Sequence, residues 1–259
     1  MPPSLPRQRR PPCKVNSDTA SFWDHLEALR QTLLRMLAVA VVLAVAAFFF
    51  KEPLFDVVLW PLHNDFPTYR WLDAEPVELS LINTQLTEQF MIHMKVALMA
   101  GALVASPYLL YALFSFVAPA LYPNELSISR RLVMAAYAVF VVGLVVNYFV
   151  VFPLTLRFLA TYSVSPDVVP MLTLENYTDT LLMMSLAFGL VFELPVVSWL
   201  LGRFGLLRAE WMSRYRRHAF VVILIVAAVI TPTTDILSLV IVSLPIALLY
   251  ELSIRLVPK

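Results

Sequence analysis

An ionisable side chain inside an apolar segment is the first candidate for chemistry in this sequence. Residues 181–201 read LLMMSLAFGLVFELPVVSWLL, with Glu193 as their one ionisable residue and Pro195 close behind it. A carboxylate at the middle of a membrane-spanning helix costs roughly 2.5–3.5 kcal/mol, so such a residue normally faces protein or a wet cavity. Glu193 is therefore a functional candidate. The alternative is an interior glutamate satisfied by neighbouring hydroxyls or held protonated.

A second set of charges precedes the first apolar run, in the segment SFWDHLEALRQTLLR at residues 21–35. Its apolar residues recur at helical spacing and leave Asp24, Glu27 and Gln31 on another face. The pattern predicts a helix at the membrane interface that turns into, or continues as, the first span. An interfacial anchor without a binding role is the alternative.

Patterns for catalysis or metal binding do not occur. The four histidines show no metal-ligand spacing with any acid or with Cys13, the only cysteine. No nucleophile triad, phosphate loop or glycine-rich fingerprint is present, and the chain has only five glycines. The sequence predicts neither an enzyme nor a bound cofactor or metal, and a membrane-embedded hydrolase would lack its nucleophile and base.

The elements that must position these residues are membrane helices. Of 259 residues, 60% are hydrophobic and 14% charged, and the mean hydropathy is +0.77, which is typical of a polytopic membrane protein. A net charge of +1 argues against nucleic-acid binding. Residues 1–20 predict a disordered basic tail, and residues 21–259 a membrane domain without a cleaved signal peptide.

The apolar runs predict an all-α fold of six spans. The fifth is short, at roughly 14 residues against the roughly 20 that cross a bilayer core. No internal repeat is evident, which weighs against the commoner transporter architectures. The predicted spans are Leu33–Phe50, Phe90–Phe116, Leu132–Phe152, Tyr177–Leu201, His218–Thr231 and Ile236–Val257.

The positions of Lys and Arg predict the orientation. The side that holds both termini carries most of them, whereas the opposite side has only Lys51, Arg70 and Arg157. By the positive-inside rule both termini are expected in the cytoplasm, as an even number of spans requires. The long outer loop, Lys51–Gln89, is acidic and predicts a folded cap. Glu88 and Lys95 share one helix face and are interpreted as an anchor at the outer interface.

Five fragments of this chain resemble the TatC family, the multispanning receptor of the twin-arginine translocase. They occur in the family's order and span residues 21–257. They are HLEALR with the apolar run that follows it, TEQFMIHMK (Thr87–Lys95), FSFVAPALYPNE (Phe114–Glu125), FGLVFELPV (Phe188–Val196) and TPTTD (Thr231–Asp235) before a last span ending in LYE.

The resemblance implies a concave, glove-like bundle in the cytoplasmic (inner) membrane, with short fifth and sixth helices. It implies a receptor that binds twin-arginine signal peptides of folded cargo and associates with TatA- and TatB-like single-span proteins. The resemblance also implies contact with membrane lipids, self-association in the complex and transport that uses the proton motive force.

The resemblance also implies a signal-peptide site on the cytoplasmic face. Glu125 matches the family's signal-recognising glutamate, and a carboxylate suits the planar guanidinium of arginine through paired hydrogen bonds. Each such bond is worth roughly 1.5–3 kcal/mol. Arg30 matches the family's arginine and is expected to orient the acids. Phe116, Leu121 and Tyr122 are expected to shape the loop.

One position departs from the family pattern. Ala28 occupies the place of the usual glutamate, and the acid lies one residue earlier, at Glu27. Because one residue turns a helix by about 100 degrees, Glu27 is only a candidate for the second carboxylate.

Two more acids are matched by the resemblance. Glu193 is placed on the concave inner wall, where it would bond a polar residue of a partner helix or hydrate and thin the membrane. Asp235 follows the fifth span, and its alternative is capping of the sixth helix. A second hypothesis for the whole chain is an ion-coupled permease with Glu193 as proton carrier and Lys95 as its partner.

Overall fold

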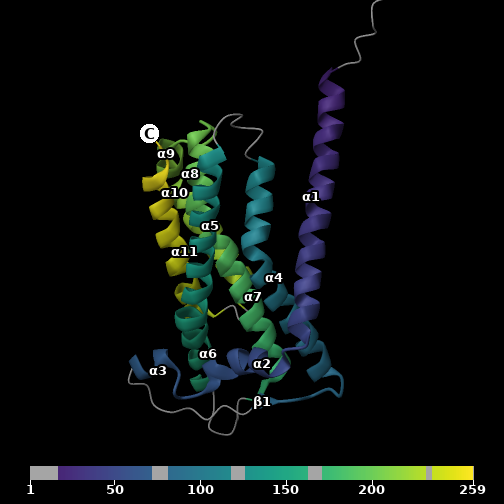
Figure 1. Ribbon diagram of the computed structural model, residues 1–259. Helices are drawn as coiled ribbons and strands as arrows, with labels where there is room; N and C mark the ends of the chain where they lie inside the picture. The colour runs from purple at the N-terminus through teal and green to yellow at the C-terminus, as the bar shows by residue number, and fades with distance from the viewer. Residues whose placement is uncertain (1–16, 72–80, 118–125, 163–170, 232–234, 259) are drawn as a thin grey trace, which may run out of the picture.

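The computed structural model describes residues 17–71, 81–117, 126–162, 171–231 and 235–258, with backbone alone at 17–25, 116–117 and 126–130. Long helices stand side by side and shorter elements cover one end (Figure 1). The long helices are α1 (Ser17–Phe48), α4 (Glu88–Val117), α5 (Leu126–Val146), α7 (Leu174–Phe192), α10 (Arg216–Ile230) and α11 (Ile236–Leu256), and the shorter α8 (Leu194–Arg203) follows α7 in the same span.

The end of the bundle where α1 begins and α11 ends is called the terminal end, and the opposite one the cap end (Figure 1). At the terminal end lies α9 (Ala209–Arg214). The cap end holds α2 (Lys51–Leu59), the 3₁₀ turn Trp60–Leu62, α3 (Pro67–Trp71), α6 (Phe152–Thr161) and the strands β1 (Leu81–Ile82) and β2 (Leu172–Thr173).

Within the described residues, five helical segments are long and apolar enough to cross a membrane: Leu26–Phe48, Glu88–Ser115, Arg131–Thr161, Leu174–Arg203 and Ile236–Leu256. The predicted multi-pass helical fold is thereby confirmed. The fifth predicted span corresponds to α10, which has 15 residues, about 22 Å, and is short as expected. A six-span count that includes α10 stays a prediction.

The structure differs from the predicted fold in two details. The resemblance implies a short last helix, but α11 has 21 residues, about 31 Å, in agreement with the span Ile236–Val257 that the apolar run predicts. The fold is also not purely helical, since β1 and β2 form a two-residue parallel pair, with Leu81 opposite Leu172. Two-residue strands carry too little alternation to be read from a sequence.

Helix α1 joins the charged N-terminal segment and the first span into one helix of 32 residues, about 48 Å. It begins at Ser17, inside the stretch predicted to be a disordered tail. It packs along α4, where a Cβ on Gly101 would lie 2.3 Å from the backbone nitrogen of Ala44. Only a glycine permits this approach of the two helices.

The core centres on α7, whose Tyr177, Met184 and Phe188 are buried. Against α5, two glycines each receive a ring from the other helix. A Cβ on Gly143 would lie 2.8 Å from Phe192, and one on Gly189 would lie 2.6 Å from Phe140. A π-helical turn, Asn147–Val151, continues α5 into α6.

The cap is held by hydroxyl groups that reach its backbone. Tyr148 and Tyr177 donate to the carbonyl oxygens of Val57 and Val58, at 2.6 Å and 2.7 Å. Arg157 of α6 lies over the ring of Tyr69 in α3, with Cζ 5.5 Å from the ring centroid. Burial raises the pKa of Tyr69 to about 12, against the opposing charge of Arg157. The predicted folded cap is confirmed in the described part of the loop.

Candidate functional site

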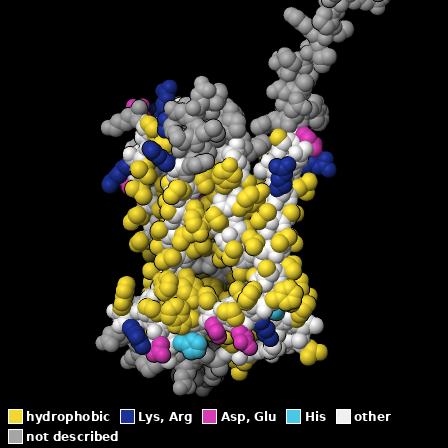
Figure 2. Space-filling model, viewed as in Figure 1, with side chains coloured by type: hydrophobic (Ala, Val, Ile, Leu, Met, Phe, Trp, Pro, Cys, Tyr) yellow, Lys and Arg dark blue, Asp and Glu magenta, His cyan; other side chains and the backbone are white. Residues whose placement is uncertain are grey.

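Charged side chains gather toward the two ends of the molecule, and a hydrophobic band lies between them in the view of Figure 2. This distribution suits a protein whose middle lies in hydrocarbon and whose ends lie in water. The candidate residues accordingly belong to three places: the cap end, the bundle interior and the terminal end.

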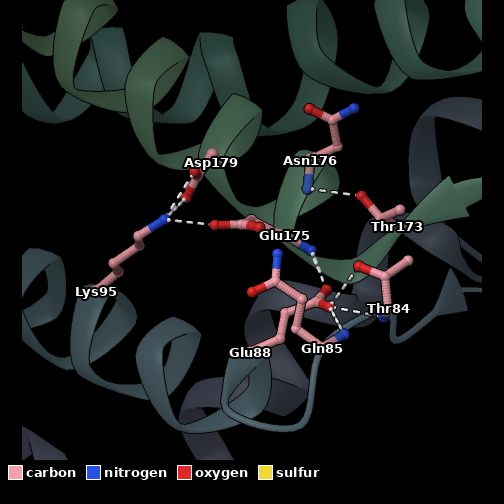
Figure 3. Close-up of polar contacts among 8 residues, drawn as sticks. All are labelled: Thr84, Gln85, Glu88, Lys95, Thr173, Glu175, Asn176 and Asp179. Carbon is pink, nitrogen blue, oxygen red and sulfur yellow. Dashed lines mark hydrogen bonds and ion pairs between the residues drawn. The ribbon is translucent and has the colours of Figure 1, made fainter.

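At the cap end, Lys95 joins α4 to α7 through two carboxylates (Figure 3). Its Nζ lies 2.8 Å and 2.9 Å from the two carboxylate oxygens of Asp179, and 3.3 Å from Glu175. All three side chains are nearly half exposed. The network joins two helices, whereas the sequence predicted only an anchor at the outer interface for Lys95.

Glu88 ties the start of α4 to its surroundings in the same region (Figure 3). One carboxylate oxygen accepts from the backbone N–H groups of Thr84 and Gln85 at 2.7 Å and 3.0 Å, and from the Thr84 hydroxyl. The other accepts from the backbone N–H of Glu175 at 3.1 Å. A carboxylate at the first turn of α7 also complements the helix dipole.

Sequence reasoning missed Glu175 and Asp179 as partners of Lys95, because it started the fourth span at Tyr177. The signal was available. Two acids four residues apart share one helix face, and they stand at the head of an apolar run. In the predicted topology, the second and fourth spans both begin on the side opposite the termini, and the second carries Lys95 near its start. Opposite charges at matching depth on two spans predict a pair.

Inside the bundle, Glu193 lies where the helix of the fourth span breaks. Because Pro195 has no N–H, the carbonyl of Val191 loses its helical partner, and α7 ends at Phe192 before α8 starts at Leu194. Glu193 is buried, with only 8% of the residue exposed, so its carboxyl group lies inside the bundle and not on its outer surface. Both of its carboxylate oxygens are buried and have no hydrogen-bond partner among the described residues.

Another interior polar group lies in the π-helical turn of α5. Asn147 is fully buried and donates from Nδ2 to the Ser185 hydroxyl at 3.0 Å, while its Oδ1 has no partner among the described residues. This pair links α5 to α7. Sequence reasoning missed it, since a single asparagine in an apolar run does not reveal its partner.

The pairing of Glu193 with Lys95 in the permease hypothesis is wrong. Lys95 is bound to Glu175 and Asp179 at the cap end. Glu193 follows Asp179 by about 14 residues, which is about 21 Å along the helix. An ammonium group cannot pair with a carboxylate across that distance.

At the terminal end, Glu27 and Arg30 lie on the exposed surface of α1. Their side chains are 3.7 Å apart, and Gln31 donates to Glu27 at 3.3 Å. The orienting role of Arg30 stays a prediction. Glu125, Leu121 and Tyr122 lie outside the described residues, and the same holds for the side chain of Phe116.

Asp235 caps the last helix. One of its carboxylate oxygens accepts from the backbone N–H of Ser238 at 2.7 Å, in the first turn of α11. The capping interpretation of Asp235 is therefore confirmed, and its matched role in the family stays a prediction.

A band of apolar helix surface between two charged ends, with ion pairs joining the helices at one end and a buried acid inside, defines a multi-pass membrane protein. Comparison with known proteins gives the family. The family model described as "Sec-independent protein translocase protein (TatC)" matches residues 24–245. The chain therefore belongs to the TatC family.

Curated relatives and solved structures agree with this assignment. The TatC proteins of Koribacter versatilis and Desulforapulum autotrophicum are 35% and 34% identical over 90% and 92% of this chain, and 83% and 84% of their own. A crystal structure described as the twin arginine translocase receptor TatC in DDM matches with a TM-score of 0.79 at 30% identity, covering 91% of this chain and all of that one.

Proposed function

We propose that this protein is the receptor subunit of a twin-arginine translocase in the cytoplasmic (inner) membrane, with both termini in the cytoplasm. It binds the twin-arginine signal peptide of folded cargo at the terminal end and recruits TatA- and TatB-type single-span partners. The observation that carries the proposal is the family match over residues 24–245, together with the likeness to a structure described as that receptor.

The signal-peptide site is proposed to combine Glu125 with Glu27 and Arg30, and with the apolar side chains of Phe116, Leu121 and Tyr122. Glu125 belongs to the connection between α4 and α5. Helix α4 ends and α5 begins at the terminal end, where the charged turns of α1 also lie (Figure 1). Carboxylates from two segments at one end of the bundle suit two adjacent guanidiniums.

Partner recruitment is proposed to use Glu193 and Asp235. A buried carboxyl group without a partner is costly, and a polar side chain from a neighbouring helix would remove that cost. Asp235 already caps α11, so its contribution would be to fix the turn between α10 and α11.

The proposal is tested with the substitution Glu125→Gln, which removes the charge and keeps the shape. A photocrosslinking twin-arginine signal peptide should lose binding to this variant by at least about tenfold, the scale of one charge-assisted hydrogen bond. The matched control is Glu210→Gln in α9, which removes an acid at the same end and should bind normally. Unchanged crosslinking of Glu125→Gln would remove the basis of the recognition site.

A further inference from the structure

A groove opens on the bundle between α5, α8 and α11, with a volume of about 690 Å³. Two arginines, Arg131 and Arg203, line it together with apolar side chains. Arg131 lies near the start of α5 and Arg203 at the end of α8, so both mark the terminal end of the groove. The remaining wall is aliphatic and aromatic and includes Val142, Trp199 and Leu252.

The length of the groove matches one leaflet of a bilayer. Along α5 it reaches from Arg131 to Val142, and along the fourth span from Arg203 back to Phe192, about 11 residues or 16 Å in each case. Half of a hydrocarbon core is about 15 Å thick. The two guanidiniums therefore lie at headgroup depth when the apolar wall lies at acyl-chain depth.

The electrostatics of this end favour an anion. Arg203 lies against Trp199, with Cζ 5.5 Å from the ring centroid. A second cavity of about 1270 Å³ shares Arg203 with the groove, and its lining holds three further arginines against one acid: Arg208, Arg214, Arg255 and Glu210. Guanidinium groups bind phosphate oxygens in pairs, and a tryptophan suits the boundary between headgroups and acyl chains.

We infer that this groove, lined by Arg131 and Arg203, is a binding site for one anionic phospholipid of the leaflet at the terminal end. The phosphate lies between the two arginines, and an acyl chain follows the apolar wall toward Val142. The two guanidiniums at one end favour a lipid over a partner helix, because a phospholipid carries its phosphate at that depth. The inference does not depend on the proposed signal-peptide function.

The test uses the full chain in detergent and native mass spectrometry, with phosphatidylglycerol and phosphatidylcholine of identical acyl chains as probes. The natural protein should retain phosphatidylglycerol roughly tenfold better. The double variant Arg131→Gln, Arg203→Gln should retain both lipids equally. The control Arg35→Gln, Arg217→Gln removes two exposed charges at the same end outside the groove and should behave like the natural protein.

A second variant tests the acyl chain. Val142→Trp fills the far end of the groove from a side chain that is 52% exposed, so it does not overpack the core. Retention of phosphatidylglycerol should fall several-fold although no charge is changed. Equal retention of the two lipids by the natural protein, a loss in the control variant as large as in the groove variant, or full retention by Val142→Trp would each overturn the site. If Val142→Trp instead releases a copurifying single-span partner and keeps the lipid, the groove seats a helix.

Discussion

At the scale of single residues, Glu193 combines burial with an absence of partners in the described part of the chain. A buried group left unsatisfied costs about 1–3 kcal/mol, which a purely structural glutamate would have no reason to retain. The break at Pro195 places this carboxyl at a point where the helix wall is already interrupted. We therefore expect that Glu193 lowers the stability of the fold and is retained for a function.

This interpretation predicts opposite effects of Glu193→Met on stability and on assembly. Replacing the unpaired carboxyl by an apolar side chain of similar volume should raise the free energy of unfolding by about 1–3 kcal/mol. Copurification of a TatA- or TatB-type partner should fall, while twin-arginine peptide crosslinking stays normal. Thermal unfolding in detergent and affinity purification measure the two. A loss of stability in Glu193→Met would instead indicate a structural glutamate.

For Lys95 we predict the opposite effect, because its charge is expected to stabilise the fold. Lys95→Met should lower the free energy of unfolding by about 1 kcal/mol, the scale of partly solvated ion pairs, and the melting temperature by about 2–4 °C. Removing Asp179 as well, with Asp179→Asn, should recover part of the loss, because fewer carboxylates are then left unpaired.

The control for Lys95 is Lys51→Met, an exposed cation at the cap end, which should leave the melting temperature unchanged. An equal loss in both variants would mean that general charge balance, and not the link between α4 and α7, causes the effect. Peptide binding should be normal in both variants, because the terminal end is untouched.

At the scale of elements, α1 depends on one close contact. Its spanning part is largely exposed and lies against α4, where Gly101 meets the backbone of Ala44. Leucine at position 101 should force the two helices apart. The overpacking is expected to cost about 1–3 kcal/mol. Replacing a glycine inside a helix gains back roughly 1 kcal/mol of helix propensity, so the net effect is destabilising.

The substitution Gly101→Leu should therefore lower the melting temperature in detergent and loosen α1. Its control is Val104→Ile on the exposed side of the same helix, which adds a methylene group that meets no neighbouring helix and should be neutral. A stable Gly101→Leu protein would show that α1 and α4 do not approach as closely as the structure has them.

At the scale of the whole molecule, the orientation in the membrane can be measured with the chain's only cysteine. Cys13 precedes α1, so a membrane-impermeant maleimide should label it in inverted vesicles and leave it unlabelled in spheroplasts. As a control, Asp65→Cys in a Cys13→Ser background places the thiol in the cap, which should be labelled from the opposite side. Labelling of Cys13 in spheroplasts would reverse the topology.

The sequence by itself determined the membrane class, the long helices and the position of Glu193 inside the fourth span. These features depend on composition and on local apolar runs, since a helix in lipid must satisfy its own backbone and be apolar over its length. It also indicated the family through five short fragments. The apolar run also predicted the length of α11, whose 21 residues match the predicted span Ile236–Val257 with Pro245 inside it.

Only the tertiary structure decided which residues meet. Lys95 and Asp179 form an ion pair although they are 84 positions apart, and Arg131 and Arg203 line one groove from different helices. The glycines that admit Ala44, Phe140 and Phe192 also belong to other helices than these residues. Such contacts depend on how the helices lie beside one another, which the packing of the whole bundle determines. Whether a segment forms a helix depends mainly on that segment's own sequence.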